Sequence, residues 1–203
     1  MGGAARAGHY PRRVDPPTPI LLVTGPPASG KTFVAGLVAD RLRLPLIAKD
    51  DIKETLFESL GTGDVAWSQQ LGRATRELIF WALEAHLRAR RPVLVESNFA
   101  AEDARPRFRA LAGRHPFAPL EIHCTADEDV LLARYAARIG SRHPGHLDEQ
   151  RMPEIAEAIG SGRHGPVRAG GQLLVVDTTA FEDVDADALL RAARAHVGAD
   201  GVP

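Results

Sequence analysis

Apolar runs alternate with amphipathic stretches along most of the chain. Residues 20–25 (ILLVTG) form a continuous apolar run that ends in glycine, which is typical of a strand buried on both faces. Residues 31–43 follow with helical spacing, and a second short strand, 44–49, precedes a short helix that Gly61 ends. Three more buried strands are predicted at 92–97, 120–125 and 172–178, followed by helical stretches at about 103–113, 127–140 and 186–197.

A longer helix is predicted between residues 64 and 91. Apolar residues recur there with steps of four and three positions, a spacing that places them on one face of a helix. We expect this face to be buried; it comprises Trp67, Leu71, Ala74, Leu78, Trp81 and Ala85.

Strands that alternate with helices predict an α/β fold, with a five-stranded parallel sheet and right-handed crossovers. The alternative is a mixed α+β fold with some antiparallel pairs. At 203 residues the chain is long enough for one compact domain, which we place at 20–197. Residues 1–19 and 198–203 are expected to be flexible ends.

Composition narrows the range of functions. A formal net charge of −1 gives no reason to expect a nucleic-acid or membrane-surface protein. The single cysteine, Cys124, excludes an internal disulfide, fits a reducing cytosol and lies in a predicted strand as inert packing. No apolar run approaches the roughly 18 residues of a membrane helix, and the N-terminus has no signal-peptide pattern. We therefore expect a cytoplasmic protein, monomeric or homodimeric.

Residues 25–32 (GPPASGKT) match the P-loop pattern G-x-x-x-x-G-K-[ST] in full, between the first strand and its helix. Glycines let the backbone wrap closely, so that N–H groups and the positive helix end point at phosphate oxygens. Lys31 adds a positive charge for the β- and γ-phosphates, and the Thr32 hydroxyl is a magnesium ligand. The alternative is that the glycine-rich segment only forms a turn, which does not explain the flanking strand and helix. We expect ATP and Mg²⁺ to bind here, with contacts from Gly25, Pro26, Pro27, Ala28, Ser29, Gly30, Lys31 and Thr32.

Three classes of protein use such a loop: kinases, GTP-binding switches, and ATPase motors or partner modules. A guanine-specific switch needs an N-K-x-D type motif, and the string AKDD at 48–51 lacks the Asn and lies on the wrong strand. Large ATPase modules need more chain and an acidic Walker B pair. A kinase for a small acceptor therefore fits best.

The two adjacent aspartates at 50–51 are expected to differ in role. If Asp51 is the N-cap of the helix, Glu54 occupies N3 and completes an acidic variant of the capping box. If Asp50 were the cap, Lys53 would occupy N3 and oppose the helix dipole. Asp50 then projects from the end of the second strand, where it can accept the proton of an attacking hydroxyl. The alternative is that both aspartates only cap the helix and contact solvent.

These residues carry a resemblance. KDDIKETL (49–56) resembles the RDD-x-R segment of the 5′-kinase domain of phage polynucleotide kinase, at the same distance from the P-loop. VLVESNFAAEDARPRF (93–108) is similar to its acid- and Asn-bearing strand and turn, and LLARYAARIG (131–140) resembles its lid helix. Chloramphenicol phosphotransferase, zeta toxins and gluconate kinase-like enzymes share this architecture. The resemblance covers roughly 20–180 and implies a P-loop NTPase fold of nucleotide-kinase type with a helical lid at about 134–165.

By position, the resemblance implies that Asp50 is the general base, Lys53 the basic residue on the substrate side and Arg138 the lid arginine. The family has Arg where this chain has Lys53, which weakens a bidentate grip on a substrate phosphate. It has Asp where this chain has Glu96, which favours a magnesium contact through water. Without an end-healing domain or a basic surface, a polynucleotide acceptor is improbable.

The predicted lid is basic. No acidic residue occurs between Asp129 and Asp148. Arg134, Arg138 and Arg142 have i, i+4, i+8 spacing, which would stack three guanidinium groups on one helix face. We expect Arg134 and Arg138 to act in catalysis, and Arg138 and Arg142 to bind the triphosphate, with 140–146 (GSRHPGH) as hinge and tip. The alternative is a solvated basic face. His143 and His146 lack a third ligand for a metal.

The remaining candidates concern substrate and base. Glu96 is expected to serve the magnesium shell or the substrate, while Asn98 could position the acceptor or cap the next helix. Trp67, Gln70, Arg73 and Arg76 lie near the start of the long helix, where acceptors bind in this fold, although a Trp at such a position is more often core than a substrate platform. Thr178 and Thr179 follow the last strand and are expected beside the adenine.

The sequence thus predicts an ATP- and magnesium-dependent phosphotransferase. The expected acceptor is a hydroxyl of a small molecule such as a sugar or aminocyclitol, a nucleoside, or an antibiotic modified for resistance. The alternatives are a P-loop ATPase or regulatory module that acts with a protein partner, and a polynucleotide 5′-kinase.

Overall fold

The computed structural model describes residues 16–198. Most of the two predicted flexible ends, residues 1–15 and 199–203, lies outside the described residues. The predicted N-terminal boundary is slightly wrong, because Thr18 and Pro19 already belong to the first strand. Gly198 caps the last helix.

Five strands form one sheet in the order β2-β3-β1-β4-β5, and every pairing is parallel. The strands are β1 (Thr18–Thr24), β2 (Leu46–Ala48), β3 (Val93–Glu96), β4 (Phe117–Thr125) and β5 (Gln172–Asp177). This arrangement confirms the predicted five-stranded parallel α/β fold and excludes the mixed alternative with antiparallel pairs.

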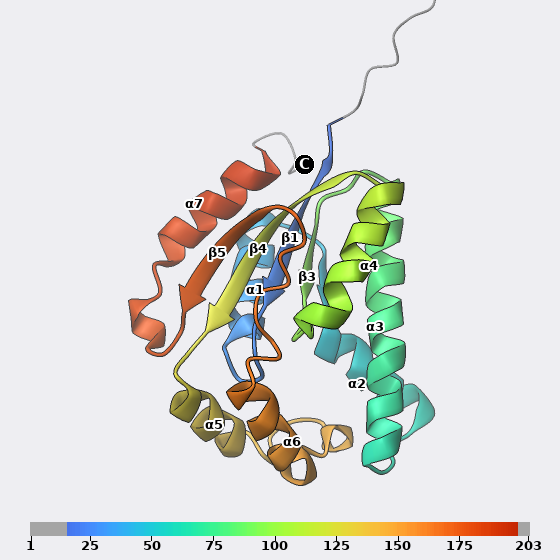
Figure 1. Ribbon diagram of the computed structural model, residues 1–203, viewed down its shortest axis with the longest axis vertical. Helices are drawn as coiled ribbons and strands as arrows, with labels where there is room; N and C mark the ends of the chain where they lie inside the picture. Colours follow the sequence, from blue (N-terminus) through green and yellow to red (C-terminus); the bar gives the residue numbers. More distant parts are fainter. Residues whose placement is uncertain (1–15, 199–203) are drawn as a thin grey trace, which may run out of the picture.

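Helices cover both faces of the sheet (Figure 1). They are α1 (Lys31–Leu42), α2 (Lys49–Leu60), α3 (Val65–Arg88), α4 (Ala101–Arg114), α5 (Glu128–Ala137), α6 (Asp148–Gly160) and α7 (Ala186–Val197). Helices α1 and α7 cover one face and α3 and α4 cover the other, while α5 and α6 lie beyond the arrowheads of the strands. Most of the predicted helical lid, at about 134–165, consists of the end of α5, the loop after it and α6. None of the helices in residues 16–198 is long and apolar enough to cross a membrane.

The central strand β1 explains the first apolar run of the sequence. Leu21 and Val23 pack in the core cluster under α1 and α7. Ile20 and Leu22 point the other way, into the cluster under α3 and α4. All four side chains are fully buried, as expected of a strand in the middle of a sheet that has helices on both sides.

The predicted apolar face of α3 is wrong. Of its six residues only Leu71 is buried, while Leu78 is 38% and Trp81 66% exposed. The buried face instead combines apolar side chains in the C-terminal half with small or polar ones near the N-terminus: Ser68, Gly72, Thr75, Ile79, Phe80, Leu83 and Leu87. The polar part of this face packs against the neighbouring α2 and the site, so hydrophobic periodicity does not identify it.

Strand register brings the chemical residues to one edge of the sheet. Glu96 of β3 pairs with Val23 of β1 on one side and Ala48 of β2 on the other. The chain leaves β1 into the P-loop and leaves β2 directly into α2. Because all three strands are parallel, the P-loop, Glu96 and the start of α2 meet at the same edge.

A buried carboxylate ties the segment after α6 to the sheet. Glu121 of β4 is 2% exposed and accepts a hydrogen bond from the Thr24 hydroxyl at 2.8 Å. It also accepts from the backbone N–H groups of Val167 (2.6 Å) and Arg168 (2.8 Å). These bonds fix the return from the lid to β5.

We expect Glu121→Ala to lower the free energy of unfolding by about 2–4 kcal/mol, because two backbone donors and one hydroxyl lose a charged acceptor. Urea denaturation monitored by circular dichroism measures the change. The matched control is Glu157→Ala on the exposed face of α6, which should stay within about 0.5 kcal/mol of the parent. Equal effects of the two substitutions would contradict the anchoring role.

Candidate active site

A cavity of about 730 Å³ lies at the carboxyl ends of β1, β2 and β3, between the P-loop and helices α2, α3, α4 and α6. Its size is in the range of sites for small-molecule ligands. Most of the predicted site residues line it: Pro27, Ala28, Gly30, Lys31, Thr32, Asp50, Lys53, Arg73, Glu96, Asn98, Arg134, Arg138 and Arg142. Six do not: Gly25, Pro26, Ser29, Trp67, Thr178 and Thr179.

The P-loop adopts a tight conformation that needs its glycines. Gly25 has φ +141°, and a Cβ there would lie 2.2 Å from the carbonyl oxygen of Cys124. Gly30 has φ +73°, and a Cβ there would lie 2.5 Å from the ring of Phe181. Both the close approach and the positive φ exclude a larger residue. The loop leads straight into α1 at Lys31, so the free N–H groups of the first helical turn face the cavity.

Lys31 and Glu96 are both buried and act on each other electrostatically, although they form no ion pair within residues 16–198. Burial lowers the pKa of Lys31, and the negative charges of Glu96 and Asp50 oppose this shift. Burial likewise raises the pKa of Glu96, against the effect of Lys31. The Lys31 ammonium donates a hydrogen bond to the Pro26 carbonyl at 2.7 Å, so it is held within the loop that it serves.

The residues present fit a magnesium-bound triphosphate. The exposed Thr32 opens on the cavity beside the P-loop, and the Glu96 carboxylate opens on the same space. Mg²⁺ prefers such oxygen ligands and usually keeps several waters and phosphate oxygens. Within residues 16–198, no three His, Cys, Asp or Glu side chains cluster closely enough to hold a metal by themselves.

The capping argument for the two aspartates is wrong. Helix α2 begins at Lys49, and its N-cap is Ala48, which makes no side-chain cap bond. Both aspartates therefore lie in the first turn, where carboxylates complement the helix dipole. Asp50 lines the cavity, whereas Asp51 is exposed. The direction of each side chain around the helix separates the two residues, not a capping box.

Asp50 lies between two cations. Its carboxylate contacts the Lys49 ammonium at 3.3 Å and forms an ion pair with the Arg142 guanidinium. Burial would raise the pKa of Asp50, but Lys49 and then Arg142 outweigh it and hold this pKa far below the ordinary range. Asp50 is therefore ionised at every physiological pH. Because the pKa of Asp50 is lower in the folded state than in the unfolded state, its ionisation stabilises the fold above the unfolded pKa of 3.8. This stabilisation is lost as the pH falls from 3.8 toward the lower pKa of the folded state.

The predicted stack of three arginines on one helix face does not form. Helix α5 ends at Ala137, Arg138 is its C-cap, and Arg142 lies in the following loop. Arg134 donates to the carbonyls of Thr178 (2.8 Å) and Thr179 (3.1 Å). The Arg138 guanidinium lies over the Tyr135 ring, and its Nε is buried with no hydrogen-bond partner among the residues that the structure describes.

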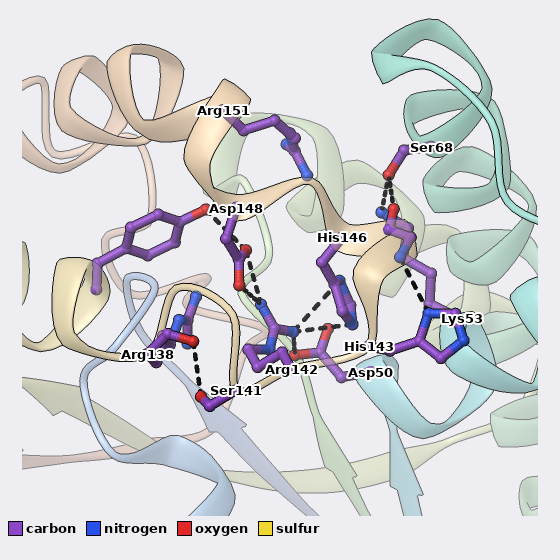
Figure 2. A network of polar contacts seen from close by, with 12 residues as sticks. Asp50, Lys53, Ser68, Arg138, Ser141, Arg142, His143, His146, Asp148 and Arg151 are labelled. Carbon is purple, nitrogen blue, oxygen red and sulfur yellow. Dashed lines mark hydrogen bonds and ion pairs between the residues drawn. The ribbon is translucent and has the colours of Figure 1, made fainter.

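Arg142 is the centre of a polar network that closes the lid onto α2 (Figure 2). Besides Asp50, it contacts the buried Asp148 at 3.1 Å, which in turn accepts a hydrogen bond from the Tyr135 hydroxyl at 2.9 Å. His146 lies within hydrogen-bond distance of Arg142 and contacts Glu54 at 2.8 Å. Arg142 is thus neutralised by two carboxylates, contrary to the predicted unpaired charge. Asp148 and Glu54 come from segments far apart in sequence, so spacing alone carries no signal for this network.

The predicted substrate residues separate into two groups. Lys53, Arg73, Glu96 and Asn98 line the cavity. Ala100 is the N-cap of α4, so Asn98 does not cap that helix. Trp67 does not line the cavity: its indole N–H donates to the Gly61 carbonyl at 3.0 Å, and its ring packs beside Gly63. It therefore secures the turn between α2 and α3.

Thr178 and Thr179 lie behind the P-loop rather than in the cavity. The buried Thr178 hydroxyl contacts the carbonyls of Ser29 (3.1 Å) and Thr125 (2.9 Å). Sequence reasoning missed the aromatic pair beside them. Phe33 and Phe181 are 60% and 37% exposed and make an edge contact, and Arg134 lies over Phe181. Only the tertiary structure shows that these apolar rings remain exposed beside the P-loop.

Other cavity residues were also missed. They are mostly charged and come from α4, α6 and the segment after it: Asp103, Arg107, Asp148, Arg151, Arg163 and His164.

Comparison with known proteins agrees with this geometry. A family model described as an AAA domain (AAA_33) matches residues 20–159. The chain belongs to this family. A protein from Chloroflexus aurantiacus J-10-fl, provisionally assigned as a kinase in its crystal structure, is 38% identical, with 89% of this chain and 100% of that chain covered and a TM-score of 0.82. No curated protein matches.

A crystal structure of a sugar kinase from Janibacter sp. HTCC2649 has the same fold. It is 15% identical, with 92% of this chain and 97% of that chain covered and a TM-score of 0.54. The predicted membership of the P-loop kinase group and the predicted fold are therefore confirmed.

We expect Arg142→Ala to raise the pKa of Asp50, because one of its two contacting cations is removed while burial remains. A pH titration of the side-chain carboxyl carbons by NMR measures the shift, with Asp50→Asn to assign the resonance. The control is Arg151→Ala, which removes a lid arginine that pairs with Glu154 instead. An unchanged Asp50 titration in Arg142→Ala would contradict the ion pair.

Proposed function

We propose that the protein is an ATP- and magnesium-dependent phosphotransferase that transfers the γ-phosphate to a hydroxyl group of a small molecule. One observation carries this proposal: Asp50 and the P-loop residue Lys31 open on the same cavity and influence each other's pKa. A carboxylate facing the phosphate-binding lysine across a cavity is the arrangement that phosphoryl transfer to an alcohol requires.

In the proposed reaction, the acceptor oxygen forms a bond to the γ-phosphorus as the bond from that phosphorus to the β–γ bridging oxygen breaks. Asp50 accepts the hydroxyl proton, and the electron pair of the broken bond leaves on ADP. Lys31 and the N–H groups of the P-loop neutralise the phosphate oxygens, while Thr32 and, through water, Glu96 would hold Mg²⁺. The metal, when bound, neutralises charge that develops between the β- and γ-phosphates.

The lid arginines have separate roles in this proposal. Arg138 has a buried Nε that lacks a partner within residues 16–198, so an incoming phosphate oxygen would satisfy it. Arg134 is held by two carbonyls and lies over Phe181, which with Phe33 offers an apolar platform for a base beside the P-loop. Arg142 is expected to leave Asp50 for the phosphates, which frees the carboxylate to accept a proton.

The acceptor is expected to be small. A cavity of about 730 Å³ has to hold the triphosphate end of the nucleotide together with the acceptor. A sugar or aminocyclitol, a nucleoside or an antibiotic fits this volume, whereas the near-neutral chain disfavours a polynucleotide. The provisional assignment of the 38% identical Chloroflexus aurantiacus protein as a kinase supports phosphotransfer. The competing function is an ATPase in which Asp50 positions water and a partner protein stimulates phosphate release.

Label transfer from γ-labelled ATP tests the proposal. We expect label on at least one alcohol in a panel of sugars, sugar acids, nucleosides and hydroxylated antibiotics, and none with Lys31→Ala, which should also lose magnesium-dependent ATP binding while keeping its fold. Label found only as free phosphate, with every acceptor untouched and a partner protein accelerating its release, would favour the ATPase.

We expect Asp50→Asn to lower turnover by roughly 10²–10⁴-fold, the usual contribution of a general base, with ATP binding retained. Steady-state kinetics and calorimetric ATP titration measure the two quantities. Asp51→Asn is the matched control, since the neighbouring carboxylate is exposed and points away from the cavity. Similar losses from both substitutions would rule out a specific role for Asp50.

A further inference from the structure

The cavity carries a marked excess of positive charge. Among the residues that the structure describes, eleven lysines and arginines and five carboxylates line it. Several of these cations already have acidic partners: Lys49 and Arg142 contact Asp50, and Arg151 contacts Glu154. Lys31, Arg134 and Arg138 flank the proposed phosphate site. The cations that remain come mostly from α2 and α3, the part of the cavity that the proposed function leaves to the acceptor.

Three of them form what we call the cationic wall: Lys53 of α2, and Arg73 and Arg76 of α3. None of the three has a carboxylate within ion-pair distance in residues 16–198. Helical spacing brings Gln69, Gly72, Arg73 and Arg76 to one side of α3, at positions i, i+3, i+4 and i+7, and all four line the cavity. Glu77, one turn after Arg73, pairs with Arg107 of α4 instead.

Lys53 is the buried end of the wall. It is 2% exposed, yet within residues 16–198 its ammonium donates only to the neutral hydroxyl of Ser68, at 2.9 Å (Figure 2), and otherwise lies over the Phe57 ring. Gly72 of α3 lies beside it, and a Cβ there would make an ordinary van der Waals contact with the Lys53 ammonium at 3.9 Å. Burial lowers the pKa of Lys53 to about 7, helped by the charges of Lys49 and Arg151 and opposed by Asp50. A buried ammonium without a counter-ion is unfavourable until an anion binds.

Arg76 has a similar environment nearer the middle of α3. Burial lowers its pKa, and the neighbouring Arg107 and Arg73 lower it further, while Asp103 of α4 opposes the shift without forming an ion pair. Arg107 itself is paired with Glu77 and lies over the Phe80 ring, so its position is fixed. Two arginines and a lysine that point into one cavity can grip a carboxylate or phosphate from different directions.

We infer that the acceptor of this enzyme carries a negatively charged group, a carboxylate or a phosphate, that binds to the cationic wall formed by Lys53, Arg73 and Arg76. The inference rests on the proposed function, because it assigns this side of the cavity to the acceptor. It narrows the acceptor from any small alcohol to a hydroxylated anion such as a sugar acid or a sugar phosphate. The wall would also set the direction of the acceptor, with its charged end at α3 and its hydroxyl toward Asp50.

Calorimetric binding to the full chain in the presence of Mg²⁺ and ADP tests this inference without requiring turnover. The probes are matched by size: glycerol with glycerate and glycerol 3-phosphate, and glucose with gluconate and glucose 6-phosphate. We expect at least one anion to bind about tenfold or more tightly than its neutral counterpart. Comparison of the two acid types shows whether the wall prefers carboxylate or phosphate.

Variants of the cationic wall test whether its three residues recognise the anion specifically. The double substitution R73Q/R76Q should weaken binding of the preferred anion by about fivefold or more and leave ADP affinity unchanged. Lys53→Met should abolish the preference, and Lys53→Arg should keep it, which distinguishes a charge role from a structural bond to Ser68. The matched control is Arg88→Gln, an exposed arginine in the last turn of the same helix, which should have no effect.

Equal affinity for neutral and anionic probes, or a preference that survives in both R73Q/R76Q and Lys53→Met, would overturn the inference. Its failure is distinguishable from that of the proposed function. Transfer of labelled phosphate to neutral and acidic alcohols alike would keep the kinase and remove the anionic acceptor. Tight, wall-dependent binding of anions that never receive label would keep the anion site and count against the kinase.

Discussion

Parallel strands place their carboxyl ends at one edge of a sheet, and every chemical feature of this protein depends on that constraint. Glu96 pairs in register with both Val23 and Ala48, so the ends of β1, β2 and β3 are level. From that edge the P-loop leaves β1 and α2 leaves β2. The loop can pass directly against the backbone of β4 there because Gly25 has no side chain. Lys31, Asp50 and Glu96, separated by long stretches of sequence, consequently share one cavity.

The second constraint is electrostatic. Arg142 joins the lid to α2 by contacting Asp148 and Asp50 together. The ion pair keeps Asp50 ionised, but it also makes the carboxylate a weak base for as long as the contact lasts. A triphosphate in the P-loop would compete with Asp50 for the same guanidinium group. The ion pair between Arg142 and Asp50 holds the lid against α2, and nucleotide binding could replace it with a contact between Arg142 and a phosphate. Nucleotide binding would then change the position of the lid and free Asp50 at the same time.

The charges of the cavity are divided between its two sides. Near the P-loop, Lys31 has Glu96 and Asp50 as electrostatic partners. On the side of α2 and α3, Lys53, Arg73 and Arg76 form no ion pair among residues 16–198, although Asp50 and Asp103 act electrostatically on Lys53 and Arg76. Because a buried cation is costly without an anion, this local excess of positive charge is informative about what binds on that side. Net charge conceals it, since the chain as a whole is nearly neutral.

The sequence by itself determined the local features of this protein. Continuous apolar runs identified all five strands, although the predicted burial of the last one is wrong, because β5 at the edge of the sheet is only half-buried. GPPASGKT identified the P-loop, because phosphate binding depends on residues close together in the chain. The two faces of α3 and the arginines of the lid were decided only by the tertiary structure. Periodicity selected Leu78 and Trp81 for burial, but α3 turns Ser68, Gly72 and Thr75 inward instead. Residue spacing predicted that Arg142 lies beside Arg138 on one helix face, but α5 ends before Arg142. Arg142 instead forms an ion pair with Asp50, 92 residues earlier in the chain. Contacts of that kind depend on how helices pack, which no local pattern encodes.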